Sequence, residues 1–277
     1  MKNKTIKPQK SLGQNFLIDK NIAEKIVRLS GIDKTSGVLE IGPGLGALTM
    51  PLADAAGHVT AIELDSKLAK ELEKILADYK NITIIHGDVL KLDINKIIKE
   101  HLHAELLHVC ANLPYNITTP VITKLIETGG FNFITIMIQK EVAQRICAKP
   151  GTPEYGAFTV FVNYYTTPEI LFDVPPECFN PRPKVTSSVI RMKVKDTQQL
   201  QKEHKISGED EKLFFKVVKA AFSQRRKTLV NALYATFEST HNKEEIAKII
   251  ECCGFDVKIR GERLGIEEFK KITSKLY

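Results

Sequence analysis

Several patterns that would place the chain in a particular class of protein are missing from the sequence. Its five cysteines show no CxxC spacing and no histidine partners at the intervals of a zinc finger, so we expect reduced thiols and no metal site. No run of eighteen apolar residues occurs, and the lysine-rich start MKNKTIKPQK has no apolar core of a secretory signal. We therefore expect a cytoplasmic protein that does not enter a membrane.

The residues that are present predict a globular chain with an excess of positive charge. With 277 residues, of which 43% are hydrophobic, the chain is long enough for one full domain and a smaller one. Its formal net charge of +7 suits a polyanionic partner, and on charge alone it suits a basic protein without one equally well. Residues 1–10 are expected to form a mobile tail.

From residue 36 onward, short β-rich runs alternate with helical patterns, which is typical of a parallel sheet with helices on both faces. The expected strands read GVLEIG, HVTAIEL, ITIIHGD, LLHVCAN and FITIMIQK. The runs FTVFVNYYTTPEILFDVP and SSVIRMKVK are expected as the last strands, with antiparallel pairing. The sequence therefore predicts an α/β, Rossmann-like fold.

A change of composition after Lys195 marks the end of this domain. The polar run DTQQLQKEHKISGEDE is expected to be a linker. Beyond it, EKLFFKVVKAAFSQRRKTLVNAL carries apolar residues at helical spacing, and NKEEIAKIIECCG ends at Gly254, a residue suited to follow a helix. We therefore predict a domain over residues 1–195 and a small all-helical domain over residues 196–277.

A glycine-rich turn follows the first expected strand. LEIGPGLGALT places Gly42, Gly44 and Gly46 between a strand and a helix, where a ligand can approach the backbone. The turn alone is also compatible with tight packing against its own helix. Glu63 ends the next strand, where a carboxylate can accept from both hydroxyls of a ribose, and this suits a nicotinamide dinucleotide or S-adenosylmethionine.

A further carboxylate separates these two cofactors. Asp88 follows the third strand, where it could accept from an adenine amino group, and this placement favours S-adenosylmethionine. Phosphate transfer is disfavoured because the sequence has no GxxxxGK[ST] loop. For Glu63 and Asp88 the plainer alternative is a helix cap or a surface carboxylate.

The stretch NLPYNITTP follows the fourth strand, at the sheet edge where these groups are expected to converge. Pro114 disfavours helical geometry at Leu113, so the Leu113 carbonyl can face outward beside the Asn112 side-chain oxygen. Two acceptors with Tyr115 as a flat surface suit the amino group of a base that is stacked outside its helix. A simple turn is the alternative interpretation.

Taken together, GQNFL, EIGPGLGALT, NLPYNITTP, FNPRPKVTSSVIR and FSQRRKTLVNAL closely resemble the KsgA-type adenine dimethyltransferases of small-subunit ribosomal RNA. The resemblance implies a methyltransferase domain followed by a small helical domain. It also implies transfer of two methyl groups to each of two adjacent adenines in a hairpin loop near the RNA 3′ end. The substrate it implies is the ribosomal RNA within an assembling particle, and we expect the enzyme to act as a monomer.

The same resemblance assigns roles to individual residues. The residues it assigns to cofactor contact are Asn15, Leu17, Gly42, Glu63, Asp88 and Asn112. It places the residues from Asn112 to Tyr115 at the point of methyl transfer. Phe179 is implied as a second aromatic against the target adenine, although a core phenylalanine before a proline turn is an equal rival.

Basic residues near these motifs are candidates for contact with RNA phosphates. Arg182 and Lys184 flank Phe179, and Arg225, Arg226 and Lys227 are expected on one helix whose opposite side is apolar. A solvated helix face is the usual alternative for such a run of charges.

Three rival functions stay open at this point. A macrolide-resistance-type methyltransferase acting on large-subunit RNA shares the fold and a closely similar motif, Asn-Leu/Ile-Pro-Tyr, but FSQRRKTL and PRPKVTSSVIR favour the small-subunit family. A non-catalytic RNA-binding assembly factor would not need a cofactor cleft. A protein-amide methyltransferase faces the same chemical problem, but it fits this basic chain poorly.

We predict that Glu63→Ala abolishes methyl transfer and leaves RNA affinity within about a few fold of the wild type, because cofactor and RNA are expected to occupy separate surfaces. Methylation assays and RNA titrations on the same preparation measure the two effects. A comparable loss of both would contradict separate surfaces.

Overall fold

The computed structural model describes residues 14–204, 208–224 and 226–276. The tail expected at residues 1–10 lies outside these ranges, as does Arg225. The chain divides into two compact units, Met1–Ala143 with Thr167–Val194 and Gln144–Thr166 with Lys195–Tyr277. We call the first the sheet unit and the second the helical unit.

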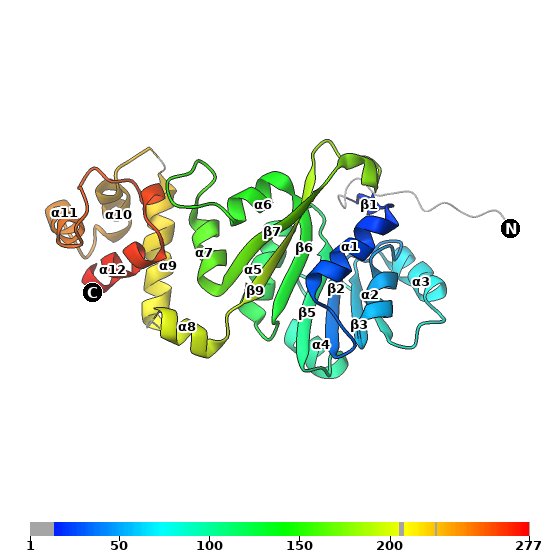
Figure 1. Ribbon diagram of the computed structural model, residues 1–277. Helices are drawn as coiled ribbons and strands as arrows, with labels where there is room; N and C mark the ends of the chain where they lie inside the picture. Colours follow the sequence, from blue (N-terminus) through cyan, green and yellow to red (C-terminus); the bar gives the residue numbers. More distant parts are fainter. Residues whose placement is uncertain (1–13, 205–207, 225, 277) are drawn as a thin grey trace. The chain divides into compact units, whose positions relative to one another are not determined.

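The central sheet of the sheet unit has seven strands (Figure 1). In spatial order they are β4 (Ile82–His86), β3 (His58–Glu63), β2 (Ser36–Ile41), β5 (Leu106–Asn112), β6 (Phe133–Gln139), β9 (Ser187–Val194) and β7 (Thr166–Val174). The strands from β4 to β6 in this order pair in parallel, and β9 pairs antiparallel with β6. The predicted Rossmann-like fold is therefore confirmed, and so is the antiparallel pairing of a late strand.

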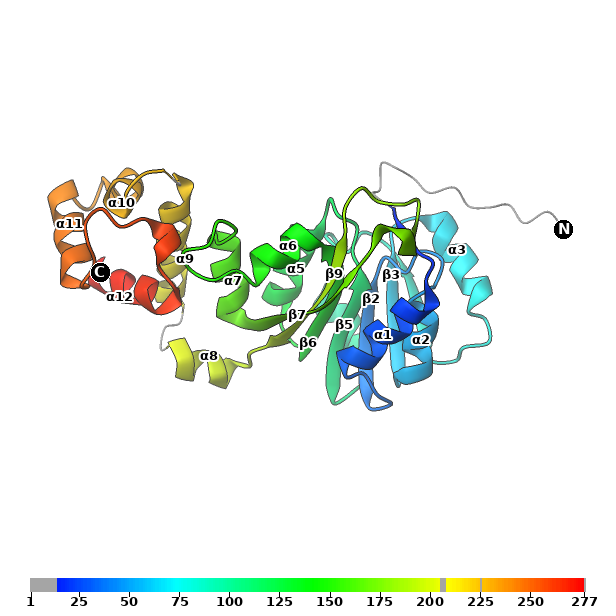
Figure 2. The ribbon, with the colours of Figure 1, turned by 45° about the horizontal axis from the view of Figure 1, so that its top comes forward.

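Helices cover both faces of this sheet (Figures 1 and 2). The helices of the sheet unit are α1 (Lys20–Ser30), α2 (Thr49–Ala55), α3 (Ser66–Ile75), α4 (Ile94–His101) and α5 (Thr118–Thr128). On one face, Ile26 of α1 and Leu52 of α2 pack in a cluster with Val38, Cys110 and Met137 from the strands. In both views α4 and α5 lie behind the sheet, on the face opposite α1 and α2.

Two short strands lie outside the central sheet. β1 (Phe16–Leu17) pairs antiparallel with β8 (Phe179–Asn180), and the 3₁₀-helix η2 (Pro176–Cys178) precedes β8. The Ile18 N–H also donates to the Cys178 carbonyl at 2.9 Å. This pairing fixes the segment around residue 16 through a much later part of the chain.

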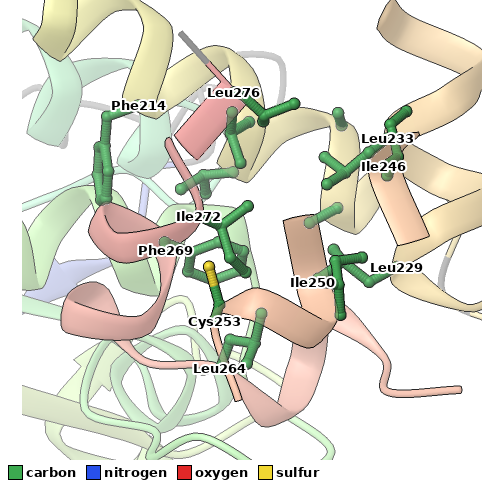
Figure 3. Close-up of a cluster of buried hydrophobic side chains, with 14 of the residues drawn as sticks. Phe214, Leu229, Leu233, Ile246, Ile250, Cys253, Leu264, Phe269, Ile272 and Leu276 are labelled. Atoms are coloured by element: carbon green, nitrogen blue, oxygen red, sulfur yellow. The ribbon is translucent and has the colours of Figure 1, made fainter. Parts of the chain in front are cut away.

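The helical unit is built around one apolar core (Figure 3). Its helices are α7 (Ala157–Tyr165), α8 (Thr197–His204), α9 (Glu209–Ser223), α10 (Leu229–Phe237), α11 (Lys243–Cys252) and α12 (Ile266–Leu276), with the 3₁₀-helix η3 (Gly261–Arg263) before α12. The short helix α6 (Lys140–Ile146) runs from one unit into the other. In Figure 3, Phe269 and Ile272 of α12 meet Ile250 of α11 and Leu264 in the same cluster. None of the helices within the described ranges is long and apolar enough to cross a bilayer.

The division of the chain differs from the predicted boundary in one respect. The change near Lys195 coincides with it, but residues 144–166 belong to the helical unit and not to the sheet. Val160 and Tyr164 of α7 are buried in the core of the helical unit. The Tyr155 hydroxyl also donates to the Leu264 carbonyl at 2.9 Å.

The prediction of a strand over FTVFVNYY was wrong, because these residues form α7. Apolar residues occupy nearly every position, so the run fits a buried helix as well as a strand. The helix begins after Gly156, whose N–H donates to the Thr159 hydroxyl at 3.1 Å. Tyr164 then packs against Phe214 of α9, with ring centroids 5.2 Å apart.

Two expectations about the region after Lys195 also need correction. The expected linker contains α8, so part of it is helical. The single helical pattern over EKLFFKVVKAAFSQRRKTLVNAL is two helices, α9 and α10. Thr228 begins α10 by accepting from the Asn231 N–H, and the Leu229 N–H donates to the Ile259 carbonyl at 2.7 Å, which turns the chain away from the direction of α9.

We predict that Phe269→Ala lowers the free energy of unfolding by about 3–5 kcal/mol, because it leaves a cavity in a fully buried site. Tyr234→Ala, at a side chain 36% exposed in the same unit, is the control and should change it by less than about 0.5 kcal/mol. Denaturant titration followed by circular dichroism measures both. Equal effects of the two changes would contradict the burial described above.

Candidate active site

A cleft opens where the parallel strands end. It encloses about 1050 Å³, its open mouth included, and belongs wholly to the sheet unit. Segments from five parts of the chain line it, namely residues 14–17, 40–48 except 46, 62–64, 87–89 and 112–117. Most of the residues predicted for cofactor contact and methyl transfer are therefore together in one cleft.

The glycine turn after β2 forms one wall. Gly44 has φ +58°, and a Cβ at this position would lie 2.9 Å from Phe16 Cδ1. Gly46 has φ +83°, and a Cβ there would lie 2.9 Å from Leu72 Cδ1 of α3. Both positions therefore require glycine. Gly46 does not line the cleft, so the structure gives it a packing position and not the ligand-facing position that we predicted.

Glu63 at the end of β3 joins the glycine turn to the start of α3. Its Oε2 accepts from the Gly44 N–H at 3.1 Å and its Oε1 from the Asp65 N–H at 2.9 Å. The side chain is 4% exposed, and burial raises the pKa of its carboxyl while these two backbone donors oppose the rise. The carboxylate is thus held rigidly at the wall of the cleft.

Glu40 of β2 is a second buried carboxyl at the cleft, and the sequence analysis missed it. It is 1% exposed, and its Oε2 has no hydrogen-bond partner among the described residues. Burial, with the neighbouring Glu63 carboxyl as a smaller cause, raises the pKa of Glu40 to about 8. A glutamate inside an otherwise apolar strand was the signal that could have identified it.

Asp88 follows β4 and lines the same cleft as the glycine turn. Its Oδ1 accepts from the Leu90 N–H at 3.0 Å, and its Oδ2 lies 3.8 Å from Lys91 Nζ. The preceding Gly87 N–H donates to the Glu63 carbonyl at 2.9 Å. The turns after β3 and β4 are therefore directly connected.

Asn112 at the end of β5 is oriented by a segment nearly a hundred residues earlier. Its Nδ2 donates to the Asn15 carbonyl at 3.1 Å, and this bond engages the nitrogen of the amide group and leaves its oxygen as an acceptor. Asn15 and Leu17, whose roles rested on resemblance alone, both line the cleft. The β1–β8 pairing explains why this early segment is fixed there.

The residues after Asn112 form a tight turn at the cleft. The Leu113 N–H donates to the Met137 carbonyl of β6 at 3.1 Å, and the Ile117 N–H donates to the Pro114 carbonyl at 3.2 Å. Tyr115 is half-buried and lines the cleft, and its hydroxyl lies 2.8 Å from Ser187 Oγ. Ser187, at the start of β9, is a further residue that the sequence analysis missed.

Phe179 does not line the cleft. Its side chain is 3% exposed and packs in the apolar cluster under α1, and its backbone pairs with Leu17. The structure thus places it where the rival interpretation, a core phenylalanine, expects it. A stacking role for Phe179 stays a prediction that requires its ring to leave this cluster.

The predicted RNA-contacting residues are exposed, but they lie in two different units. Arg182, which pairs with Glu177, and Lys184 belong to the loop between β8 and β9 of the sheet unit. Arg226 and Lys227 belong to the helical unit. The expectation of a helix for this basic run was wrong, because both residues lie between α9 and α10, and Arg225 is outside the described residues.

Within the described ranges, no group of three or more histidine, cysteine, aspartate or glutamate side chains could hold a metal ion. The site is thus a carboxylate-lined cleft at the carboxyl ends of parallel strands, beside an Asn-Leu-Pro-Tyr turn. A sequence profile described as ribosomal RNA adenine dimethylase matches residues 5–252.

The chain belongs to the ribosomal RNA adenine dimethylase family. Its similarity to individual relatives extends over nearly all of its length. It is 46% identical to the "Ribosomal RNA small subunit methyltransferase A" of Clostridium acetobutylicum, over 97% of this chain and 93% of the relative. A solved dimethyladenosine transferase from Plasmodium falciparum is 26% identical, with a TM-score of 0.75 over 93% of this chain and 95% of that chain.

The fold extends to a second kind of enzyme. The solved 23S rRNA methyltransferase ErmE has a TM-score of 0.70 over 95% of this chain and 99% of that chain. Its identity to this chain is only 23%, so the likeness shows a common fold. Membership of the family confirms the predicted resemblance, and it identifies the chain as an rRNA methyltransferase of the adenine-dimethylating type.

We predict that the free energy of unfolding of Glu40→Gln, relative to that of the wild type, increases as the pH rises from 4.5 to about 8. The unfolded carboxyl loses its proton near 4.5, whereas the folded one keeps it to about pH 8. Wild-type stability from this group is therefore fully present below pH 4.5 and is lost as pH rises through 8. The variant, neutral throughout, should gain about 5 kcal/mol over the wild type between these two values.

Urea titrations of both proteins at a series of pH values measure this difference. Glu154→Gln, at an exposed glutamate, is the control for the loss of a surface carboxyl. A Glu40→Gln difference that is the same at pH 5 and pH 8 would show that the Glu40 carboxyl is already ionised in the fold.

Proposed function

We propose that the chain transfers methyl groups from S-adenosylmethionine to the N6 amino groups of two adjacent adenines in a hairpin loop near the 3′ end of small-subunit ribosomal RNA. Each adenine receives two methyl groups. The observation that carries the proposal is that Glu63, Asp88 and Asn112–Tyr115 line one cleft. The chain that forms this cleft belongs to the adenine dimethylase family. A cofactor and a base can meet there.

The residues of the cleft fit S-adenosylmethionine. The Gly42 backbone faces the cavity, and Glu63 and Asp88 supply carboxylates for hydroxyl and amino groups. The buried Glu40 Oε2, which has no partner among the described residues, suits a hydrogen-bond donor of the same ligand. Asn15 and Leu17 would close the other side. When bound, the cofactor supplies a methyl carbon attached to a positively charged sulfur.

The contribution of the chain to the reaction is orientation and electrostatics. The adenine N6 nitrogen is a poor nucleophile because its lone pair is delocalised into the ring. The Asn112 side-chain oxygen and the Leu113 carbonyl can accept its two protons, and this favours a lone pair directed at the methyl carbon. With the cofactor bound, Asn112 and Leu113 would hold the amine so that its lone pair faces the methyl carbon, and the N6 proton would leave to water without a base from the chain.

Tyr115 supplies a surface on which the target base can stack, an interaction worth about 1–3 kcal/mol per base. The base must leave its own stack to reach the cleft. Arg182, Lys184, Arg226 and Lys227 are proposed as phosphate contacts, and Arg225 would extend the second pair. We further propose a monomeric enzyme that acts on a pre-ribosomal particle in the cytoplasm.

Two alternatives make different predictions for the substrate. A methyltransferase acting on large-subunit RNA would share the fold, as the ErmE structure does, but the 46% identity to a small-subunit enzyme favours the proposal. A non-catalytic assembly factor has no need of Glu63 and Asn112 positioned at a common cleft.

Separated small- and large-subunit precursors that lack these methyl groups, incubated with radiolabelled cofactor, test the proposal. Label is expected on the small-subunit particle, as dimethyladenosine after digestion to nucleosides. Label on the large-subunit particle alone would overturn the choice of substrate. Absence of label from both would favour the assembly factor.

We predict that Asn112→Ala lowers the rate of methyl transfer about a hundredfold or more, because an acceptor oriented by Asn15 is lost from the point of transfer. Asn95→Ala removes an exposed amide from α4, outside the cleft, and is the matched control. Single-turnover rates under saturating cofactor measure both. Equal rates for the two variants would remove Asn112 from the proposed mechanism.

A further inference from the structure

The hydroxyl of Tyr115 is bonded to a residue that has no part in the mechanism proposed above. Ser187 Oγ lies 2.8 Å from the Tyr115 oxygen, and either atom can donate. Ser187 is 0% exposed, whereas Tyr115 is half-buried with part of its surface at the cleft. Ser187 therefore contacts the hydroxyl end of Tyr115, the residue proposed as the stacking surface.

Ser187 itself is fixed by the backbone of the sheet. It is the first residue of β9 and pairs with Gln139, the last residue of β6. One residue further out, the Lys140 N–H donates to the Thr186 carbonyl at 3.0 Å. The backbone of Ser187 is therefore held in place by the sheet, and the hydrogen bond of its side chain limits the positions that the hydroxyl end of the Tyr115 ring can take.

Through this bond the buried Ser187 hydroxyl is satisfied by the hydroxyl of a half-buried tyrosine. Burial raises the pKa of the Tyr115 phenol, so the phenol stays protonated and able to donate. Removal of the Tyr115 hydroxyl leaves the fully buried Ser187 hydroxyl without this partner, and this costs more than a net hydrogen bond contributes. The pair thus favours one orientation of the ring.

We propose that Ser187 is a positioning residue that fixes the Tyr115 ring, and that this matters more for the second methyl transfer to each adenine than for the first. This inference rests on the proposed function, because it takes Tyr115 as the surface on which the target base stacks. It adds a residue and a step of the reaction for which that residue is needed.

The difference between the two steps follows from the number of protons on the amine. Before the first transfer, N6 has two protons for two acceptors, the Asn112 side-chain oxygen and the Leu113 carbonyl. After it, N6 carries one methyl group and one proton, so one of these hydrogen bonds is lost. Stacking on Tyr115 then supplies a larger share of the orientation, and a mobile ring lowers the fraction of correctly placed amines.

In the second step the N6 lone pair, restored by loss of the first proton, forms a bond to a new methyl carbon. The carbon–sulfur bond of a second cofactor molecule breaks, and its electrons go to sulfur. The last N6 proton leaves to water. The product is the dimethylated amine, and each adenine consumes two cofactor molecules. No base is required from the chain in either step, so a loss of orientation is the main effect expected from Ser187.

The test is the ratio of monomethyladenosine to dimethyladenosine made by Ser187→Ala on the small-subunit particle, measured by mass spectrometry of digested RNA at a fixed time. We expect this ratio to rise about two- to tenfold over the wild type, the range that corresponds to one neutral hydrogen bond. Ser187→Thr keeps a hydroxyl and should restore the wild-type ratio. Tyr115→Phe breaks the same bond from the other side and should raise the ratio as Ser187→Ala does.

Ser188→Ala is the matched control. Ser188 is the next residue of β9 and is also 0% exposed, but its hydroxyl donates to Asp173 Oδ1 at 2.6 Å and not to Tyr115. This change should lower stability without altering the product ratio. A ratio that rises equally in Ser187→Ala and Ser188→Ala would reduce the effect to a general loosening of β9 and overturn the inference.

A second measurement needs neither cofactor nor RNA. The midpoint temperatures of unfolding of Ser187→Ala, Tyr115→Phe and the double variant form a cycle. The loss in the double variant should be smaller than the sum of the two single losses, because neither hydroxyl is then left alone. Additive losses would show that the two side chains do not interact.

The outcomes separate this inference from the function on which it rests. If the wild type makes no dimethyladenosine on the small-subunit particle, the proposed function fails and the inference fails with it. If the wild type makes dimethyladenosine and Ser187→Ala gives the wild-type ratio, the inference alone is overturned. A raised ratio together with a non-additive cycle supports both.

Discussion

The cofactor half of the cleft depends on the contacts of one residue at the end of β3. The Glu63 carboxylate binds the backbone of Gly44 in the turn after β2 and that of Asp65 at the start of α3. The backbone carbonyl of Glu63 accepts from the Gly87 N–H in the turn after β4. Three loops that come from different parts of the sequence are thereby fixed to one another. A parallel sheet makes this possible, because the carboxyl ends of neighbouring strands meet at one edge.

The reactive half depends on a similar connection over a longer distance in sequence. Asn112 is oriented by the Asn15 carbonyl, and the segment around Asn15 is in turn anchored by the pairing of β1 with β8. Tyr115 is tied to Ser187 of β9. The Asn-Leu-Pro-Tyr turn supplies the groups that we propose to hold the base, whereas residues far away in the chain determine where these groups point. In the proposed mechanism, loss of such remote contacts would lower the rate without removing any group that touches the base.

The sequence predicted the parts of the fold that rest on local patterns. Alternating strands and helices predicted the parallel sheet, and the structure confirms it. The run over α7 was misread because it is apolar on all sides, so its periodicity does not distinguish a buried helix from a strand. The break between α9 and α10 was missed because Thr228 caps the second helix in a region whose apolar spacing continues through it.

The same distinction applies to the site. Glycines and carboxylates at strand ends could be found from sequence because a parallel sheet brings every strand end to one place. Ser187 could not, since a serine at the start of a strand has no role until its neighbours are known. Glu40 was missed although a carboxyl within an apolar strand is a signal, and only the structure shows that its Oε2 lies at the cleft without a partner among the described residues. Phe179 is a different case: the resemblance assigned it to the reacting base, the structure packs its ring in the core, and the stacking role stays a prediction.

The antiparallel strand β9 also affects the order in which a working enzyme can form during translation. Its first residue lies at the edge where the parallel strands finish, because its direction is reversed relative to β6. A ribosome has polymerised β2 to β6, with the glycine turn, both carboxylates and Tyr115, well before it reaches Ser187. Nascent chains that stop short of that point carry the groups for holding a methyl donor but not the anchor for the aromatic ring. In the proposed enzyme, the fixed position of the aromatic ring thus arises after the cofactor cleft, as a late event of synthesis.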